Sequence, residues 1–360
     1  MKKLLVLFSL TTSQLFAASV GYWQIPLNLN ASQLTSGTVP TNVLPGALPT
    51  LSTWNGGGVL TNAASPAHYF YTNWTSSAMS SNLTVPSWAR VCVVECMGAG
   101  GPGGSGGRAA AGTARTGGGG GAGGSYAMRI FRTETLWTPT LVITIPALPT
   151  GGAGPTTDNS PGTNGTAAAA STIVYVGSAV ASNYVCRAVF GAAGGAGSAS
   201  GSAGSAGAAA TTGGDFPGTA GGASSATGGA GVAGAAATSK GSRGGGSGGG
   251  ITTADVPNAG GGGISGGVHA AFNTTGGSVN GAAVQTFASL TTVPNPYYIT
   301  GLSGFSGAAG SGGATNVASA NGGDGEFPGS GGGGSGATLN GSTPGRGGNG
   351  GPGAVAITFY

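Results

Sequence analysis

The chain has 360 residues, of which 81 are glycine and 19 are proline, and it carries 11 basic and 7 acidic side chains. So much glycine is typical of disordered chains, but disorder accompanies high charge and low hydrophobicity, whereas here 5% of the residues are charged and 39% are hydrophobic. The glycine runs lack the strict three-residue period of a collagen triple helix, and glycine costs about 1 kcal/mol relative to alanine inside an α-helix, which excludes a protein of long helices.

The formal net charge is +4, and its distribution argues against a nucleic-acid partner. Binding to phosphates needs clustered Lys and Arg, whereas here the basic residues are scattered singly, apart from Lys2 with Lys3 and Arg129 near Arg132. We therefore expect no nucleic-acid partner.

The cysteines are Cys92, Cys96 and Cys186, an odd number without the spacing of a disulfide scaffold or a zinc site. On one strand Cys92 and Cys96 would point to the same face about 13 Å apart, too far to bridge. We interpret the cysteines as small buried apolar residues of a chain that folds in a reducing compartment.

The N-terminus combines Lys2 and Lys3 with a mainly apolar run at 4–10 and a small-residue patch at 17–19, so that residues 1–18 form a signal-like or anchor segment. This order is that of a secretory signal, and the run is too short to span a bilayer. A cleaved signal and a retained apolar anchor both fit the pattern.

Residues 19–84 contain little glycine. The stretch 27–45 alternates short apolar and polar runs between turn residues and has no helical period. It resembles the shaft repeats of bacteriophage tail fibres, a family in which three chains wrap together, so the resemblance implies attachment and trimerisation by 19–84. Residues 54–79 add aromatic side chains sufficient for a small knob.

From residue 85 onward, apolar and β-branched runs predict strands separated by glycine tracts. The expected strands are 89–97, 126–131, 141–145, 172–176, 184–190 and 355–360, and the tracts are 98–124, 191–250, 259–281 and 303–353.

The glycine tracts are expected to pack against one another rather than to serve as linkers. Glycine can adopt the extended three-fold helix of the polyproline II region and keeps its N–H, so neighbouring helices can hydrogen-bond laterally and satisfy their buried backbone groups. The sequence thus predicts an all-β fold: β-sandwich-like strands with packed polyglycine II helices, preceded by the fibre-like N-terminal segment.

One motif occurs twice. Residues 214–218, Gly-Asp-Phe-Pro-Gly, return as 325–329, Gly-Glu-Phe-Pro-Gly. We interpret both as a capping turn, with Phe216 and Phe327 as apolar plugs at the edge of the glycine layer.

Landmarks along residues 85–360 resemble the glycine-rich domain at the ends of phage tail fibres and adhesins. They are the opening at 85–101, the strand start at 123–126, the strand at 141–145 leading to Gly151 and Gly152, and the ending at 348–358. The middle, 191–307, departs from the pattern because it is rich in Ala and Ser and holds an insertion. The resemblance implies a rigid wedge of polyglycine helices whose distal loops bind a host receptor.

Catalytic constellations are missing from the sequence. The motif G-x-G-x-x-G at 98–103 follows a strand but lacks the helix that a dinucleotide site needs, and histidine occurs only at 68 and 269. The seven carboxylates form no pair suited to glycoside hydrolysis. We expect neither enzymatic activity, nor a cofactor, nor a metal.

The insertion between 268 and 305 is the best candidate for a binding site, because rigid aromatic side chains in loops provide contact area at low entropic cost. Its candidate receptor-binding residues are His269, Phe272, Tyr297, Tyr298 and Phe305. The loops at 155–170 and 252–258 are the alternatives.

We therefore expect a virion protein of the phage tail that binds a host surface glycan or outer-membrane protein through its glycine-rich tip. It would contact other tail proteins through its N-terminus and form a homotrimer. The alternative is a secreted bacterial glycine-rich structural protein of the cell surface, which the signal-like N-terminus favours.

Overall fold

A computed structural model describes residues 67–73, 75–180, 183–210, 213–235, 240–263, 276–279, 308–314 and 318–360. The chain divides into two compact units, Met1–Ser65 and Pro66–Tyr360. All described residues belong to the second unit.

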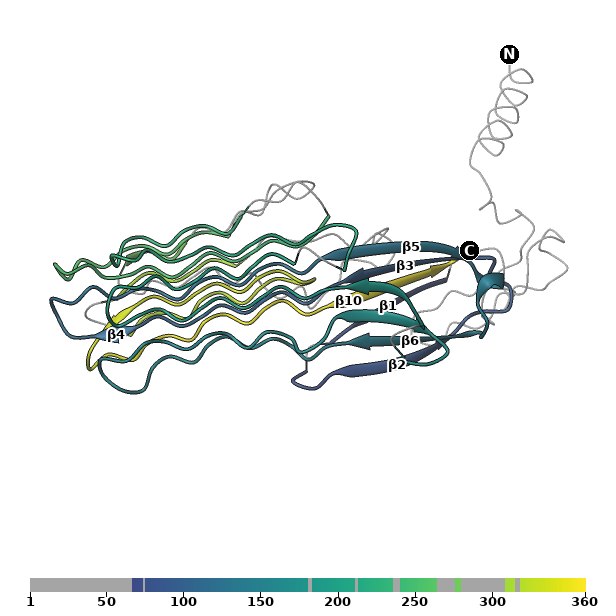
Figure 1. Cartoon of the computed structure of the whole chain (residues 1–360), viewed down its shortest axis with the longest axis horizontal. Helices are drawn as coiled ribbons and strands as arrows, with labels where there is room; N and C mark the ends of the chain where they lie inside the picture. The colour runs from purple at the N-terminus through teal and green to yellow at the C-terminus, as the bar shows by residue number, and fades with distance from the viewer. Residues whose placement is uncertain are drawn as a thin grey trace, which may run out of the picture. The chain divides into compact units, whose positions relative to one another are not determined.

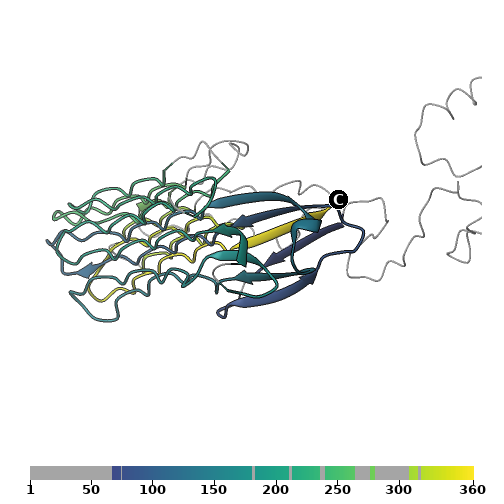
Figure 2. The same cartoon turned by 45° about the vertical axis from the view of Figure 1, so that its right-hand side comes forward.

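Two four-stranded antiparallel sheets face each other in this unit (Figure 1). The first has the order β1-β10-β3-β5, with strands Ala67–Thr72, Ala354–Phe359, Val91–Met97 and Tyr126–Arg132. The second has the order β2-β6-β7-β8, with strands Met79–Thr84, Thr140–Ile145, Thr172–Val176 and Tyr184–Ala188. A one-turn 3-10 helix, Thr133–Thr135, follows β5. The second view shows the two layers as well (Figure 2).

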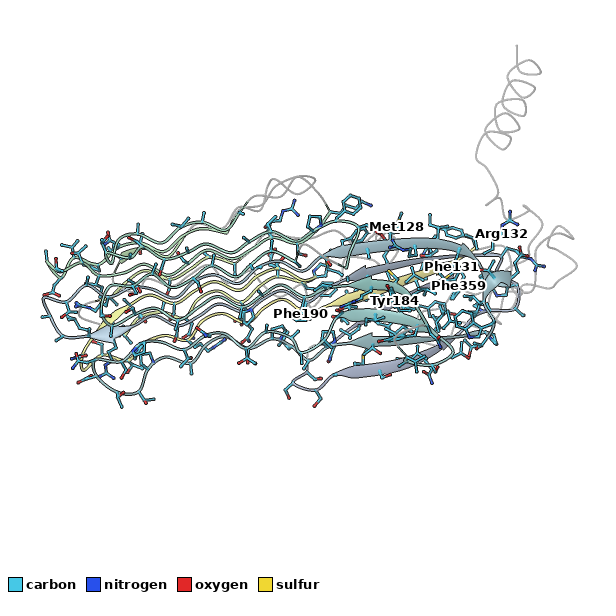
Figure 3. All side chains as sticks on the ribbon, in the orientation of Figure 1. Met128, Phe131, Arg132, Tyr184, Phe190 and Phe359 are labelled. Carbon is cyan, nitrogen blue, oxygen red and sulfur yellow. The ribbon has the colours of Figure 1, made fainter. Side chains whose placement is uncertain are left out.

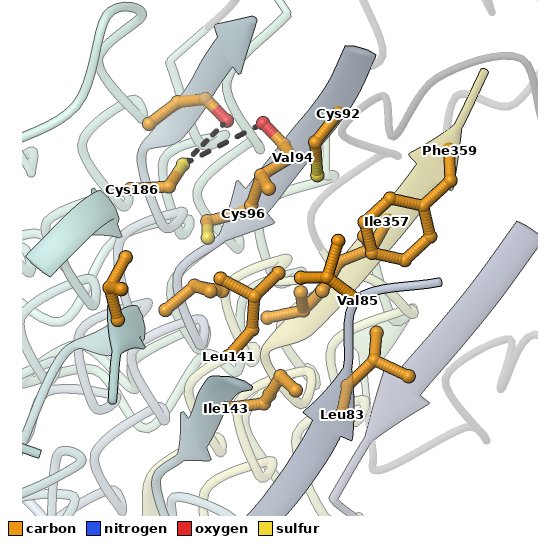
Figure 4. Packing of buried hydrophobic residues seen from close by; sticks show 14 of the residues in the cluster. Leu83, Val85, Cys92, Val94, Cys96, Leu141, Ile143, Cys186, Ile357 and Phe359 are labelled. Atoms are coloured by element: carbon orange, nitrogen blue, oxygen red, sulfur yellow. Dashed lines mark hydrogen bonds between the residues drawn. The ribbon is translucent and has the colours of Figure 1, made fainter. Parts of the chain in front are cut away.

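The core lies between the two sheets and consists of the inward-facing apolar side chains (Figure 4). On β10, Val355, Ile357 and Phe359 are fully buried, as their period of two predicts. On β6, Leu141, Ile143 and Ile145 are fully buried from the opposite sheet. The all-β prediction is confirmed, and the strands expected at 141–145 and 172–176 are β6 and β7.

The sandwich begins earlier along the chain than the sequence indicated. Strands β1 and β2 lie within residues 19–84, which the sequence assigned to the fibre-like region. β1 belongs to the first sheet and β2 to the second. Tyr69 of β1 packs edge-on against Phe359, with ring centroids 5.8 Å apart. The aromatic run interpreted as a knob is thus partly a core strand.

The described parts of the glycine tracts leave the sandwich and run back and forth as packed extended segments (Figure 1). Segment 116–125 shows the arrangement best. Its N–H groups donate in rotation to three neighbouring segments, 329–335, 189–198 and 219–222, so that residues three apart reach the same neighbour. The N···O distances are 2.8–3.0 Å. This three-residue rotation requires three residues per turn, which is the polyglycine II helix.

The same segment also accepts hydrogen bonds from 98–107, from 242–248 and from Gly207. It therefore has neighbours on six sides, as a rod does in hexagonal packing. Figure 3 shows short side chains along this array, whereas longer ones such as Phe131 and Phe359 lie on the sandwich.

Most glycines inside the array have no room for a side chain. A Cβ atom built on Gly121 would overlap the carbonyl oxygen of Gly101 and lie 2.7 Å from that of Pro102. Most glycines of the array would meet a neighbouring backbone carbonyl in the same way. Glycine is required here for close approach of the chains.

Buried serines connect the helices where the backbone pattern leaves a gap. Ser335 accepts a hydrogen bond from the N–H of Gly106 at 2.9 Å and donates to the carbonyl of Gly345 at 2.8 Å. Ser247 likewise accepts from Val232 and donates to Ala223. Because a hydroxyl both accepts and donates, each serine joins two helices at once.

The repeated Phe-Pro turns join the array to the outer face of the first sheet. Phe327 packs edge-on against Phe70, and Phe216 packs against Tyr126, with centroid separations of 5.6 and 5.8 Å. Tyr126 is fully buried there and donates its hydroxyl proton to Glu95. The interpretation of both phenylalanines as plugs agrees with these contacts.

The acidic residue of the second plug gives a testable pH dependence. Burial raises the pKa of Glu326 to about 7, and its buried Oε2 atom has no hydrogen-bond partner. The folded chain therefore binds this proton more tightly than the unfolded chain, whose carboxyl has a pKa of about 4.3. The free energy of unfolding should fall as pH rises from about 4 to 7, then stay level.

Glu326→Gln should remove this pH dependence of the free energy of unfolding, so the variant should melt higher than the wild type at about pH 8 and close to it at about pH 4. Thermal unfolding across this pH range measures the difference. Parallel pH profiles for the two proteins would contradict the expectation.

Candidate functional site

The five residues chosen from the sequence as receptor contacts are His269, Phe272, Tyr297, Tyr298 and Phe305. All five lie outside the described residues.

The candidate site that the structure describes is the end of the glycine array farthest from the sandwich, called the far end below (Figure 1). Segments that leave the sandwich reverse direction there, and Figure 1 places β4, Arg108–Ala109, at this end. The parallel partner of β4 is β9, Thr338–Leu339. The described turns at this end are 108–115, 155–161, 199–201, 226–228, 251–257 and 338–343.

Turn 108–115 is tied to turn 155–161. Arg108 forms an ion pair with Asp158 at 2.6 Å, and the N–H of Ala110 donates to Oδ1 of Asn159 at 3.2 Å. Asn159 has a φ of 54°, in the left-handed region that Asn tolerates better than most residues.

Turn 338–343 is held to both of these turns. The N–H of Asn340 donates to the carbonyl of Ala109 at 2.9 Å. Its side chain accepts from the N–H of Asn159, and the N–H of Gly341 donates to Asp158 at 3.1 Å. Three turns distant in sequence are therefore fixed relative to one another.

A buried arginine ties turn 108–115 to turn 251–257. The side chain of Arg115 is 0% exposed, and its Nη2 lies 2.8 Å from Oδ1 of Asp255. Its Nη1 donates to the carbonyls of Ala110 and Thr113 at 2.7 and 2.6 Å. Asp255 also accepts from the N–H of Gly112 at 3.0 Å. The pKa of Asp255 lies below its usual value, mainly because the guanidinium of Arg115 donates a hydrogen bond to this carboxylate.

The exposed side chains of these turns are small and mostly uncharged. They include Ala110, Thr156, Thr157, Thr253, Ala254 and Val256. The exposed acid Asp158 is neutralised by Arg108. Such a surface can recognise a partner by shape, hydrogen bonds and small apolar contacts.

Within the described part of the chain, no group of three or more His, Cys, Asp or Glu side chains could hold a metal ion. Helices long and apolar enough to cross a membrane are likewise not found in that part.

Sequence reasoning missed the role of the two arginines. It favoured aromatic residues and named 155–170 and 252–258 as alternatives, and both of those stretches contain far-end turns. A usable signal was present, because Arg108 and Arg115 are the charged residues in the glycine tract 98–124 and bracket six residues. Two arginines on either side of a short stretch with little glycine indicate a turn that is held by ion pairs with other turns.

Comparison with known families agrees with this architecture. Residues 75–214 match the family model of a glycine-rich domain. The match runs from just before β2 through β8 and into the array, and it includes two of the braced turns. No curated protein matches the chain.

Proposed function

We propose that this chain is a phage tail-fibre protein that binds a host cell-surface receptor through the far-end turns of its glycine array. The observation that carries the proposal is the bracing of turns 108–115, 155–161, 251–257 and 338–343 into one rigid surface. The match to a glycine-rich domain and the tail-fibre resemblance of the N-terminal region support it.

The array explains why a rigid surface forms without a conventional core beneath it. Its helices are fixed by backbone hydrogen bonds, so the turns start and end at defined positions. A surface ordered before binding loses less conformational entropy on association, and this raises affinity. Loops on a rigid support are the usual carriers of recognition.

The receptor is a host surface glycan or an outer-membrane protein. The far-end surface offers hydroxyl groups and small apolar side chains, which suit either receptor. We propose the aromatic segment with Tyr297 and Tyr298 as a second contact, since tyrosines stack well on sugar rings and on peptide surfaces.

A bulky charge on the far-end surface should weaken cell binding strongly without affecting folding. Thr253→Arg and Ala254→Arg alter exposed side chains of turn 251–257. We expect each to reduce binding to host cells at least tenfold with an unchanged melting temperature. Ser87→Arg, which places the same charge on the sandwich, is the matched control and should bind normally.

Binding is measured with labelled full-length protein on host cells. Unchanged binding by both turn variants would overturn the assignment to the far end. The pair Tyr297→Ala and Tyr298→Ala then tests whether the aromatic segment is the main contact.

We also propose that the N-terminal region attaches the chain to other tail proteins and that the chain is a homotrimer in the virion tail. The support is the shaft-like alternation at 27–45, whose apolar positions a single chain cannot bury. Native mass spectrometry of the full chain tests this part, because a stable monomer contradicts it.

A secreted glycine-rich structural protein of the bacterial surface is the second candidate, and the signal-like residues 1–18 favour it. Mass spectrometry of the N-terminal peptide from its native source separates the two. Retention of Met1 to Ala18 supports the virion protein, and a start near Ser19 supports secretion.

A further inference from the structure

The three cysteines occupy the sandwich core, and the fold gives two of them a relationship that the sequence does not show. Cys96 lies on β3 of the first sheet and Cys186 on β8 of the second, with 0% and 1% of their surfaces exposed. Figure 4 shows both side chains directed into the space between these strands.

The thiol of Cys186 reaches the backbone on either side of Cys96. Its Sγ lies 3.8 Å from the carbonyl oxygen of Val94, two residues before Cys96 on β3, and 3.6 Å from that of Ala127 on β5. Ala127 is itself the register partner of Cys96 across β3 and β5. Cys186 is therefore positioned over Cys96 by several independent contacts.

We infer that Cys96 and Cys186 are an oxidisable pair that forms a disulfide between the two sheets when the chain folds under oxidising conditions. The thiolate of one cysteine attacks a small-molecule disulfide, which releases one thiol and leaves a mixed disulfide. The second cysteine displaces the other half. Two S–H bonds are lost, one S–S bond forms, and the oxidant takes up two electrons and two protons as it becomes two thiols.

The bond should form during folding rather than afterwards. Burial raises the pKa of Cys96 well above that of a free thiol, and contact with Cys186 raises it further. Because the thiolate is the reacting species, the folded pair reacts slowly. The redox state of the protein therefore records the compartment in which the chain folded, since disulfides form in oxidising compartments and rarely in the cytosol.

Cys92 provides the internal control. It lies on the same face of β3, about 13 Å from Cys96 along the strand, and it is fully buried. Burial raises its pKa to about 12. Cys92 should remain a free thiol under both folding conditions.

The test refolds the full chain with reduced or with oxidised glutathione and counts free thiols after denaturation. We expect three thiols in the first sample and one in the second, with the oxidised chain lighter by two hydrogen atoms. Digestion with trypsin and a protease that cleaves after Glu95 separates Cys92 from Cys96, so peptide mapping should show Cys96 linked to Cys186. Oxidised glutathione added to the folded protein should react at least tenfold more slowly.

The bond would close a loop of about 90 residues and should raise the melting temperature by on the order of 10 °C. Cys92→Ala should retain this shift, whereas Cys96→Ala and Cys186→Ala should lose it. The peptide map requires no variant, so poor folding of a variant leaves the test intact. Three free thiols after oxidative refolding, or a bond that includes Cys92, would overturn the inference.

Discussion

Gly121→Ala should destabilise the protein by about 3 kcal/mol or more, the upper part of the range for overpacking a close-packed interior. The added Cβ would overlap the carbonyl oxygen of Gly101, which belongs to a neighbouring helix fixed by its own hydrogen bonds. Relief of the overlap requires the two helices to separate, and this breaks backbone bonds along both. Thermal unfolding should show a melting temperature lower by on the order of 10 °C.

Gly229→Ala is the matched control at the rim of the array. The nearest atom to its added Cβ would be the side-chain oxygen of Ser225 at 2.9 Å, and a hydroxyl can rotate away. We expect a change of less than about 1 kcal/mol. If Gly121→Ala melted like Gly229→Ala, close approach of the chains would not be what requires glycine in the interior.

Asp255→Ala should have the second largest effect, because it leaves the guanidinium of Arg115 buried without its counter-charge. Loss of one partner of a buried ion pair costs about 3–5 kcal/mol. Here the carboxylate is 35% exposed and partly solvated, so we expect a loss below that range, seen as a melting temperature lower than that of the wild type. The proposed binding to host cells should weaken as well, since turn 251–257 loses its tie to turn 108–115.

The double variant Arg115→Met with Asp255→Ala shows how much of the destabilisation comes from the unpaired buried charge and how much from the lost contact between the two turns. It should be more stable than Asp255→Ala alone, because no uncompensated cation remains. Glu134→Ala, which breaks the exposed pair with Arg132, is the comparison and should cost at most about 0.5 kcal/mol. A double variant no more stable than Asp255→Ala would contradict the electrostatic explanation.

The same pair predicts an acid limb in the stability profile. Because Arg115 lowers the pKa of Asp255, the stabilisation is fully present above the unfolded value of about 3.9 and is lost as pH falls through the folded value. The acid limb should therefore be shallower in Asp255→Asn than in the wild type.

Much of the fold could be predicted because its signals are local. The β-branched run at 141–145 and the period of two at 355–359 predict buried strands. The glycine tracts can satisfy their backbone hydrogen-bonding groups only when they pack against one another. The pairing of strands is non-local, so the sequence did not reveal that β1 and β2 belong to different sheets. The placement of Cys186 beside β3 and β5, near Cys96, depends on that same long-range arrangement.

The candidate site was less predictable for a related reason. Sequence reasoning weighs side chains by their chemistry and therefore selected aromatic residues. The far-end surface depends instead on which turns share one end of the array, and that follows from the direction in which each helix runs. Arg115 joins Asp255 across 140 positions, and no local pattern indicates such a pair.

The three-residue rotation of hydrogen bonds along segment 116–125 also bears on how such a chain can change over generations. Insertion or deletion of one or two residues inside a helix would turn the N–H group of every later residue in that helix toward the wrong neighbouring helix. A change of three residues keeps the rotation, and a change within a far-end turn leaves both adjoining helices untouched. The architecture therefore separates a strictly counted interior from turns whose length and composition are free to diversify.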